Sequence, residues 1–95
     1  MVTEPLFKQY ESQTEQLRAI AHPVRIAILH LLQAETCLSV TAIHQSLDIE
    51  QATASHHLRI LRQAGVLNLQ RSGRYVFYTL ANPIFSEVLA LLKKS

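Results

Sequence analysis

The segment 51–65 constrains the fold more than any other, because it combines an apolar stripe with a polar face that has no acidic side chain. Ala54, Leu58 and Leu61 follow the i, i+4, i+7 spacing of a helix that buries one face. Neutral polar and basic side chains lie off that stripe, namely Gln51, Thr53, Ser55, His56, Arg59, Arg62 and Gln63. Such a face suits the major groove of DNA, because it offers hydrogen-bond donors and positive charge. An ordinary amphipathic helix whose polar face meets only water has the same pattern, so the surrounding chain must decide between the two.

Positive charge is concentrated around that segment. From residue 51 to residue 80 there are four arginines and no Asp or Glu; the arginines are Arg59, Arg62, Arg71 and Arg74. Most of the acidic residues precede it, and these are Glu4, Glu11, Glu15, Glu35, Asp48 and Glu50. The net charge of +2 says little by itself. The local basic segment is what an electrostatic contact with nucleic acid requires.

Length and composition exclude several classes of protein. The 95 residues are enough for one domain, 1–95, with a single core. With 48% hydrophobic and 17% charged residues, the chain is neither disordered nor fibrous. Its apolar runs are too short to span a bilayer and no signal peptide opens it, so we expect a cytoplasmic protein without a membrane partner. The one cysteine, Cys37, excludes an internal disulfide and a multi-thiolate zinc site.

Enzymatic activity is not expected. The sequence has no paired acid and base, no glycine-rich phosphate loop, and no activated nucleophile with a plausible base. We therefore predict that the protein is not an enzyme and that it uses no cofactor.

The residues before the segment predict three helices. The first runs from about Glu4 to Ile20 and ends at His22-Pro23, because a residue that precedes proline is disfavoured in a helix. Pro23 suits the first position of the second helix, which continues to about Leu32 and is apolar nearly all round. After a polar connector over 33–38, Ser39 caps a short helix over 40–47, and Asp48 tolerates the left-handed backbone of a tight turn. Two short helices joined in this way form a helix-turn-helix.

After Gly65, which suits a helix C-terminus, the pattern changes to that of strands. Two strand-forming runs flank the turn at residues 71–74, which predicts a hairpin, or wing, over 67–80. Asn82-Pro83 then begins a last helix, 84–93. The predicted fold class is mainly α (α+β), a winged helix-turn-helix in the order α-α-α-α-β-β-α.

The first and last predicted helices are both amphipathic, and a domain this small has little core in which to bury them. We expect a homodimer through the first and last helices. The predicted interface residues are apolar, and they are Leu6, Tyr10, Leu17, Ile84, Val88 and Leu91. The alternative is that both helices fold back onto the core of their own chain.

Three segments resemble the motifs of one family. Residues 17–32 resemble the "LxALAxPxRLxIL" opening of ArsR/SmtB-type bacterial transcriptional regulators, residues 54–67 their "VSHHLxxLxxAGLV" recognition segment, and residues 71–80 their "RxGRxxxYxL" wing. The match extends over nearly the whole chain, in order and with the right spacing. The resemblance implies a homodimeric repressor that binds a palindromic double-stranded DNA operator and is released by an inducer, such as a metal ion or a redox or sulfur species.

The resemblance also implies which residues contact DNA. The helix 51–64 would lie in the major groove and the wing on the backbone or in the minor groove. The expected contacts are Gln51, Thr53, Ser55, His56, Arg59 and Arg62 on the helix and Arg71 and Arg74 on the wing. His57 either joins them or braces the helix. Glu50 departs from the family, which usually has Ser or Thr there, and its carboxylate puts a phosphate contact at that position in doubt.

The sensory sites of the family are not recognisable. Where metal-sensing members have a Cys-x-Cys pair this chain has Ser39 and Thr41, and where they have ligands on the last helix it has Asn82 and Ile84. We therefore predict no metal site and no dithiol. Cys37 is either a reactive thiol of a redox or sulfur sensor or a partly buried structural residue.

Three histidines and one further function stay open at this point. His22, His30 and His44 either form a site of unpredicted geometry or are packing and surface residues, with His30 expected in the interior. The alternative to DNA binding is a winged helix that serves as a protein-interaction module.

Overall fold

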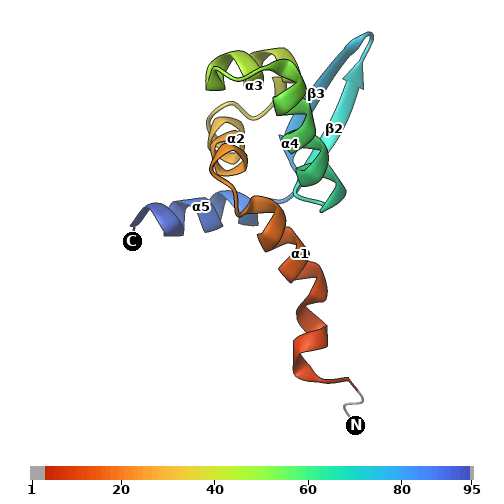
Figure 1. Cartoon of the computed structure of the whole chain (residues 1–95), viewed down its shortest axis with the longest axis vertical. Helices are drawn as coiled ribbons and strands as arrows, with labels where there is room; N and C mark the ends of the chain where they lie inside the picture. Colours follow the sequence, from red (N-terminus) through yellow and green to blue (C-terminus); the bar gives the residue numbers. More distant parts are fainter. Residues whose placement is uncertain (1–3, 95) are drawn as a thin grey trace.

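The computed structural model describes residues 4–94 (Figure 1). The elements, in chain order, are η1 (Leu6–Tyr10), α1 (Glu11–Ile20), α2 (Pro23–Ala34), β1 (Leu38–Ser39), α3 (Val40–Leu47), α4 (Gln51–Gln63), β2 (Leu67–Ser72), β3 (Tyr75–Leu80) and α5 (Ile84–Lys94). Helix α2 contacts α1, α3, α4, α5 and β3, so it lies at the centre of the fold. Its buried side chains Ile28, Leu29 and Leu32 form the middle of the hydrophobic core. The predicted winged helix-turn-helix is thus confirmed.

The predicted boundaries of the helix-turn-helix are also confirmed. His22 is extended, with a φ of −157°, and Pro23 is the first residue of α2. The Ser39 hydroxyl accepts a hydrogen bond of 3.1 Å from the backbone N–H of Ala42 and caps α3. Asp48 ends α3 in the left-handed conformation, at a φ of 55°. Each boundary is set by a residue whose backbone or side-chain chemistry favours a helix end.

The N-terminal helix differs from the prediction. A continuous helix was expected from Glu4, but the chain forms the 3-10 helix η1 before α1 begins at Glu11. Tyr10, between them, has φ −111° and ψ 16°, outside the α-helical region. No residue of η1 is buried, so no packing holds this turn in α-helical geometry.

The sheet has one strand more than predicted. Residues 33–38 were expected to be a connector, but Leu38 and Ser39 form β1 and pair with Tyr78 and Phe77 of β3. The sheet is therefore three-stranded and antiparallel, in the order β1-β3-β2. A pairing two residues long has no periodicity of its own in the sequence, because it depends on a partner strand that lies far along the chain.

The wing itself matches the prediction. Strands β2 and β3 pair from Leu67 with Leu80 to Ser72 with Tyr75, which leaves a two-residue turn at Gly73 and Arg74. Gly73 has a φ of 62°, a conformation that glycine adopts without a steric penalty. The wing extends away from the body of the molecule (Figure 1).

The two ends of the chain project from the helical body. Helix α1 with η1 points away from it in one direction, and α5 extends in another (Figure 1). Large apolar side chains on both are exposed, and they are Leu6, Phe7, Tyr10, Leu17, Ile84, Leu91 and Leu92. Val88 is half-buried. None of the helices within residues 4–94 combines the length and the hydropathy of a membrane-spanning segment.

Candidate nucleic-acid interface

Helix α4 has one fully buried face and one exposed face. Ala54, Leu58 and Leu61 have no exposed surface, as the apolar stripe predicts. Of the predicted DNA contacts on the helix, Ser55 is half-buried and the others are exposed, namely Gln51, Thr53, His56, Arg59 and Arg62. At about 100° per residue, Arg59 lies near the middle of the exposed arc, and Gln51 and Thr53 lie near its opposite edges. The buried stripe therefore fixes which side of the helix faces solvent, and Arg59 is its most central charge.

His57 is the exception among the predicted contacts. Its side chain is only 7% exposed and accepts a 3.1 Å hydrogen bond at Nδ1 from Nε of Arg25 in α2. One residue beyond His56, the helix turns the ring away from solvent and toward the core. The structure thus supports the second of the two roles predicted for His57, which is bracing of the helix. We remove it from the predicted DNA contacts, because its ring is buried.

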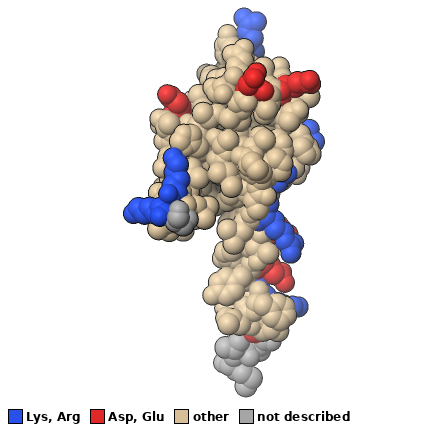
Figure 2. Space-filling view, turned by 60° about the vertical axis from the view of Figure 1, so that its left-hand side comes forward, with Lys and Arg blue, Asp and Glu red and all other residues tan. Residues whose placement is uncertain are grey.

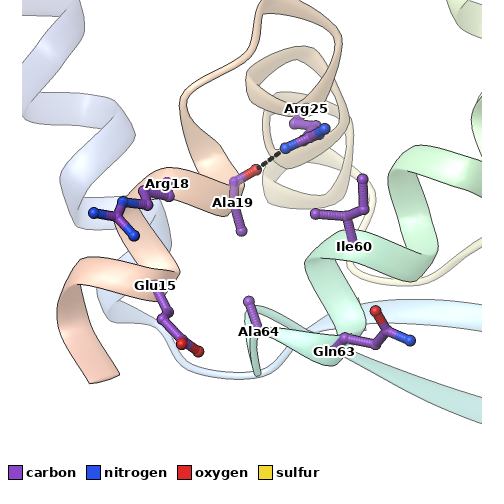
Figure 3. A pocket seen from close by; sticks show the side chains of 7 residues that line it. All are labelled: Glu15, Arg18, Ala19, Arg25, Ile60, Gln63 and Ala64. Atoms are coloured by element: carbon purple, nitrogen blue, oxygen red, sulfur yellow. Dashed lines mark hydrogen bonds between the residues drawn. The ribbon is translucent and has the colours of Figure 1, made fainter. Parts of the chain in front are cut away.

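Arg25 connects three helices. Besides its bond to His57 in α4, its Nη1 donates to the carbonyl oxygen of Ala19 in α1, at 3.2 Å (Figure 3). An open cleft of about 390 Å³ lies beside this contact, lined by Glu15, Arg18, Ala19, Arg25, Ile60, Gln63 and Ala64. In the sequence, Arg25 belongs to the family motif at residues 17–32, and no individual role was predicted for it. No local pattern signals the bond to His57, because Arg25 and His57 are 32 residues apart in the chain.

Electrostatics favour the neutral form of His57. Burial lowers the pKa of the ring, and the electrostatic influence of the neighbouring His22, Arg25 and His56 side chains lowers it further. The His22 ring lies 4.6 Å from that of His57, and the His56 ring lies 5.4 Å from it. A neutral ring with its proton on Nε2 leaves the Nδ1 lone pair for Arg25.

The start of α4 has no side-chain cap. Glu50 is the N-cap residue and is exposed, but its carboxylate accepts no hydrogen bond from the first turn. The carboxylate still interacts favourably with the helix dipole. The predicted departure at Glu50 therefore corresponds to a helix N-terminus at which an acid, and not a hydroxyl, faces solvent.

The wing brings Arg71 and Arg74 to its exposed end. It also exposes Tyr75, with 61% of its surface accessible and its ring 6.3 Å from that of Phe77. In the sequence, Tyr75 is part of the second strand-forming run of the predicted wing, and no further role was predicted for it. Its place beside the turn, two residues from Phe77 on the same strand face, was the available signal for an exposed aromatic pair.

The other histidines and the cysteine are placed as follows. His22 Nδ1 accepts from the backbone N–H of Val24 at 3.1 Å and so caps α2, and His44 Nδ1 lies 3.1 Å from the carbonyl oxygen of Ile49.

The expectation of an interior His30 is wrong. Its side chain is exposed, because α5 covers this side of α2 only in part and leaves an open cleft. The Nδ1 atom of His30 lies 3.5 Å from Nζ of Lys93 in α5. Cys37 is exposed, which contradicts one of its two predicted alternatives, a partly buried structural residue. Within residues 4–94, no three His, Cys, Asp or Glu side chains are grouped to hold a metal ion.

Comparison with known proteins places these features in a family. Residues 20–70 match the model of a helix-turn-helix domain. The chain is 35% identical over 86 residues to the transcriptional repressor PagR of Bacillus anthracis, covering 90% of this chain and 86% of that protein. The crystal structure of PagR superposes with a TM-score of 0.82 at 35% identity and covers 90% of this chain and 98% of that one.

Two further relatives show which type of helix-turn-helix regulator the chain resembles. The transcriptional repressor SmtB of Mycobacterium tuberculosis is 48% identical over 69 residues, which is 72% of this chain and half of that protein. A solution NMR structure from Mycobacterium bovis has a TM-score of 0.83 at 25% identity and covers 98% of this chain and 87% of that one. It is the homodimeric winged helix-turn-helix DNA-binding domain of a possible ArsR-family transcriptional regulator. The chain described here belongs to the ArsR/SmtB-type winged helix-turn-helix transcriptional regulators.

Proposed function

We propose that this DNA-binding regulator is a homodimeric repressor that acts in the cytoplasm on a palindromic operator. In the proposed complex α4 enters the major groove, and Arg71 and Arg74 contact phosphates or the minor groove beside it. The observation that carries the proposal is the exposed face of α4, which has basic and neutral polar side chains and no acid. PagR and SmtB are repressors, which supports the same function here.

Dimerisation is supported by the two projecting ends of the chain. Leu6, Tyr10, Leu17, Ile84 and Leu91 would be covered by the same surfaces of a second copy, since a two-fold axis pairs like with like. The face turned forward in Figure 2 is mostly uncharged between the charged side chains near its edges, which is compatible with a dimer contact on this side. The related domain from Mycobacterium bovis is homodimeric. Two reading helices about 34 Å apart would meet half-sites spaced by roughly ten base pairs.

The test is selection of duplex DNA from a random library by the purified protein, followed by gel shifts on the selected site. We expect Arg59→Ala to weaken binding roughly tenfold to a hundredfold, because it removes the central charge of the exposed face. Lys94→Ala removes a positive charge from the end of α5, and it is expected to change affinity little. Equal losses from both variants would show that only net charge matters, and an unchanged Arg59→Ala would mean that the assigned face is wrong.

No enrichment of any DNA sequence would instead favour a protein-interaction module. The inducer is a separate question, and the same gel shift addresses it with zinc, arsenite, peroxide or sulfide added. We expect no release by zinc or arsenite, since Ser39, Thr41, Asn82 and Ile84 replace the usual ligands. Release by peroxide or sulfide that is lost in Cys37→Ser would assign sensing to the exposed Cys37 thiol.

A further inference from the structure

His57 is the one buried polar or charged side chain among the described residues. It lies on the core side of α4, and its ring is next to that of His56, which is on the exposed side of the same helix. Through Arg25 it is joined to α2, and through the same guanidinium to the last turn of α1. One side chain therefore anchors the proposed reading helix to the two helices behind it.

The hydrogen bonds that the His57 and His22 rings accept require neutral rings. Nδ1 of His57 accepts from Arg25, and Nδ1 of His22 accepts from the backbone N–H of Val24. An imidazolium ion carries a proton on each nitrogen and has no acceptor. Protonation of His57 would therefore break its bond to Arg25 and place two positive charges in contact.

No carboxylate contributes to the electrostatics of His57. The side chains that lower its pKa are His22 and Arg25 on the side of α2 and His56 on its own helix. The remaining titratable or charged groups on the elements that pack against α4 are Glu11, Glu15, Arg18, His30, His44 and Arg71. Of these, Glu15 and Arg18 line the cleft beyond Arg25, and His44 is bonded to the carbonyl of Ile49. A proton gained by His57 would thus remain uncompensated.

The direction of the pH effect follows from the lowered pKa of His57. Above the ordinary value of 6.5 the ring is neutral in both the folded and the unfolded chain, and the bond to Arg25 is intact. As the pH falls below 6.5, the unfolded chain takes up the proton first, so the folded state loses stability. The loss is complete once the pH has fallen through the folded value, which lies below 6.5.

We propose that His57 is a positioning residue whose neutral ring, held by Arg25, fixes α4 for DNA binding, and that its protonation lowers operator affinity. This inference rests on the proposed function. It predicts a pH dependence opposite to that of the surface. His56 and Arg59 are exposed on the side of α4 that faces the proposed DNA, where added positive charge would strengthen attraction to phosphate. Weaker binding in acid would thus report the buried ring and not the exposed one.

The first measurement uses the free protein and needs no operator. In an NMR titration of the wild type from about pH 8 to pH 5, the His57 ring and the Arg25 Nε–H signals should change with one midpoint below 6.5. The backbone amides of α4 should shift with the same midpoint. A titration of His57 that leaves Arg25 and α4 unchanged would overturn the proposal, whatever DNA does.

The second measurement compares operator affinity at about pH 7.5 and pH 5.5 on the selected duplex. We expect the wild type to lose roughly tenfold in affinity, the effect of one charge-assisted hydrogen bond. In His57→Asn the carboxamide oxygen lies near the position of Nδ1 and accepts without titrating, so this variant should lose the acid-dependent fall. The matched control His56→Asn removes the exposed neighbouring imidazole and should keep or enlarge the fall.

Arg25→Met gives an independent route, because it removes the donor and leaves His57 in place. It should bind weakly at both pH values, close to the wild type in acid. Circular dichroism at each pH identifies any variant that is unfolded, and the NMR titration of the wild type then decides. DNA binding that is equal at both pH values would overturn this inference alone. Absence of DNA binding by every protein at either pH would overturn the proposed function, and with it this role of His57.

Discussion

Helix α4 and the N-terminal arm, formed by η1 and α1, are both amphipathic, yet the fold uses their apolar faces in opposite ways. Ala54, Leu58 and Leu61 of α4 have no exposed surface, whereas Leu17 of α1 is 59% exposed and Phe7 of η1 is 71% exposed. The apolar face of α4 is covered within one chain by α1, α2, α3 and β2. The arm has only its last turn, at Ala19 and Ile20, in the core. A pattern of apolar residues thus indicates that a face will be covered, but not by which chain.

The largest expected effect comes from the covered side. Leu58→Ala should lower the free energy of unfolding by about 3 kcal/mol, because it removes a fully buried side chain and leaves a cavity. Urea denaturation followed by circular dichroism measures the change. A loss below about 1 kcal/mol would mean that α4 is held less tightly than its burial indicates.

The exposed side should respond in assembly and not in folding. Leu17→Glu is expected to weaken the dimer roughly a hundredfold, since it buries a charge in the proposed contact, while the fold of each chain is retained. Sedimentation equilibrium gives the dissociation constant. Ser12→Glu adds the same charge to another, exposed side of α1 and is the matched control. An unchanged dimer in Leu17→Glu would mean that another surface makes the contact.

The smallest expected effect concerns the first turn of α4. Glu50→Ser removes a carboxylate close to the proposed phosphate contacts and should raise operator affinity by roughly threefold. Stability should change by less than about 0.5 kcal/mol, since a new hydroxyl cap offsets the lost interaction with the helix dipole. Glu35→Ser makes the same change at the C-terminal end of α2 and should leave affinity unaltered. A fall in affinity for Glu50→Ser would show that the acid aids DNA binding.

The helix-turn-helix was predictable because its boundaries depend on local chemistry. Pro23, Ser39, Asp48 and Gly65 each favour a helix end through their own backbone or side chain, and the structure uses each in that way. The buried stripe of α4 was predictable for the same reason, since its spacing is visible within one segment.

The features that were missed depend on distant parts of the chain. Strand β1 exists because β3 offers it an edge, and His30 is exposed because α5 covers only part of α2. The burial of His57 and its bond to Arg25 depend on how α4 and α2 cross, which the sequence of neither helix specifies. Sequence patterns therefore located the exposed face of the candidate site but not the contacts that support it from behind.

The short strand β1 has a mechanical consequence. Its Ser39 pairs with Phe77 of the wing and also caps α3, so one residue links the sheet to the helix-turn-helix. The wing is thus attached to the helix-turn-helix at the middle of β3, and within one protomer it would move together with α3 and α4 as one rigid unit. A dimer would then adapt to a different operator spacing by a change in the angle between its two protomers. That change would occur at the proposed dimer contact, which the projecting ends of the chains form.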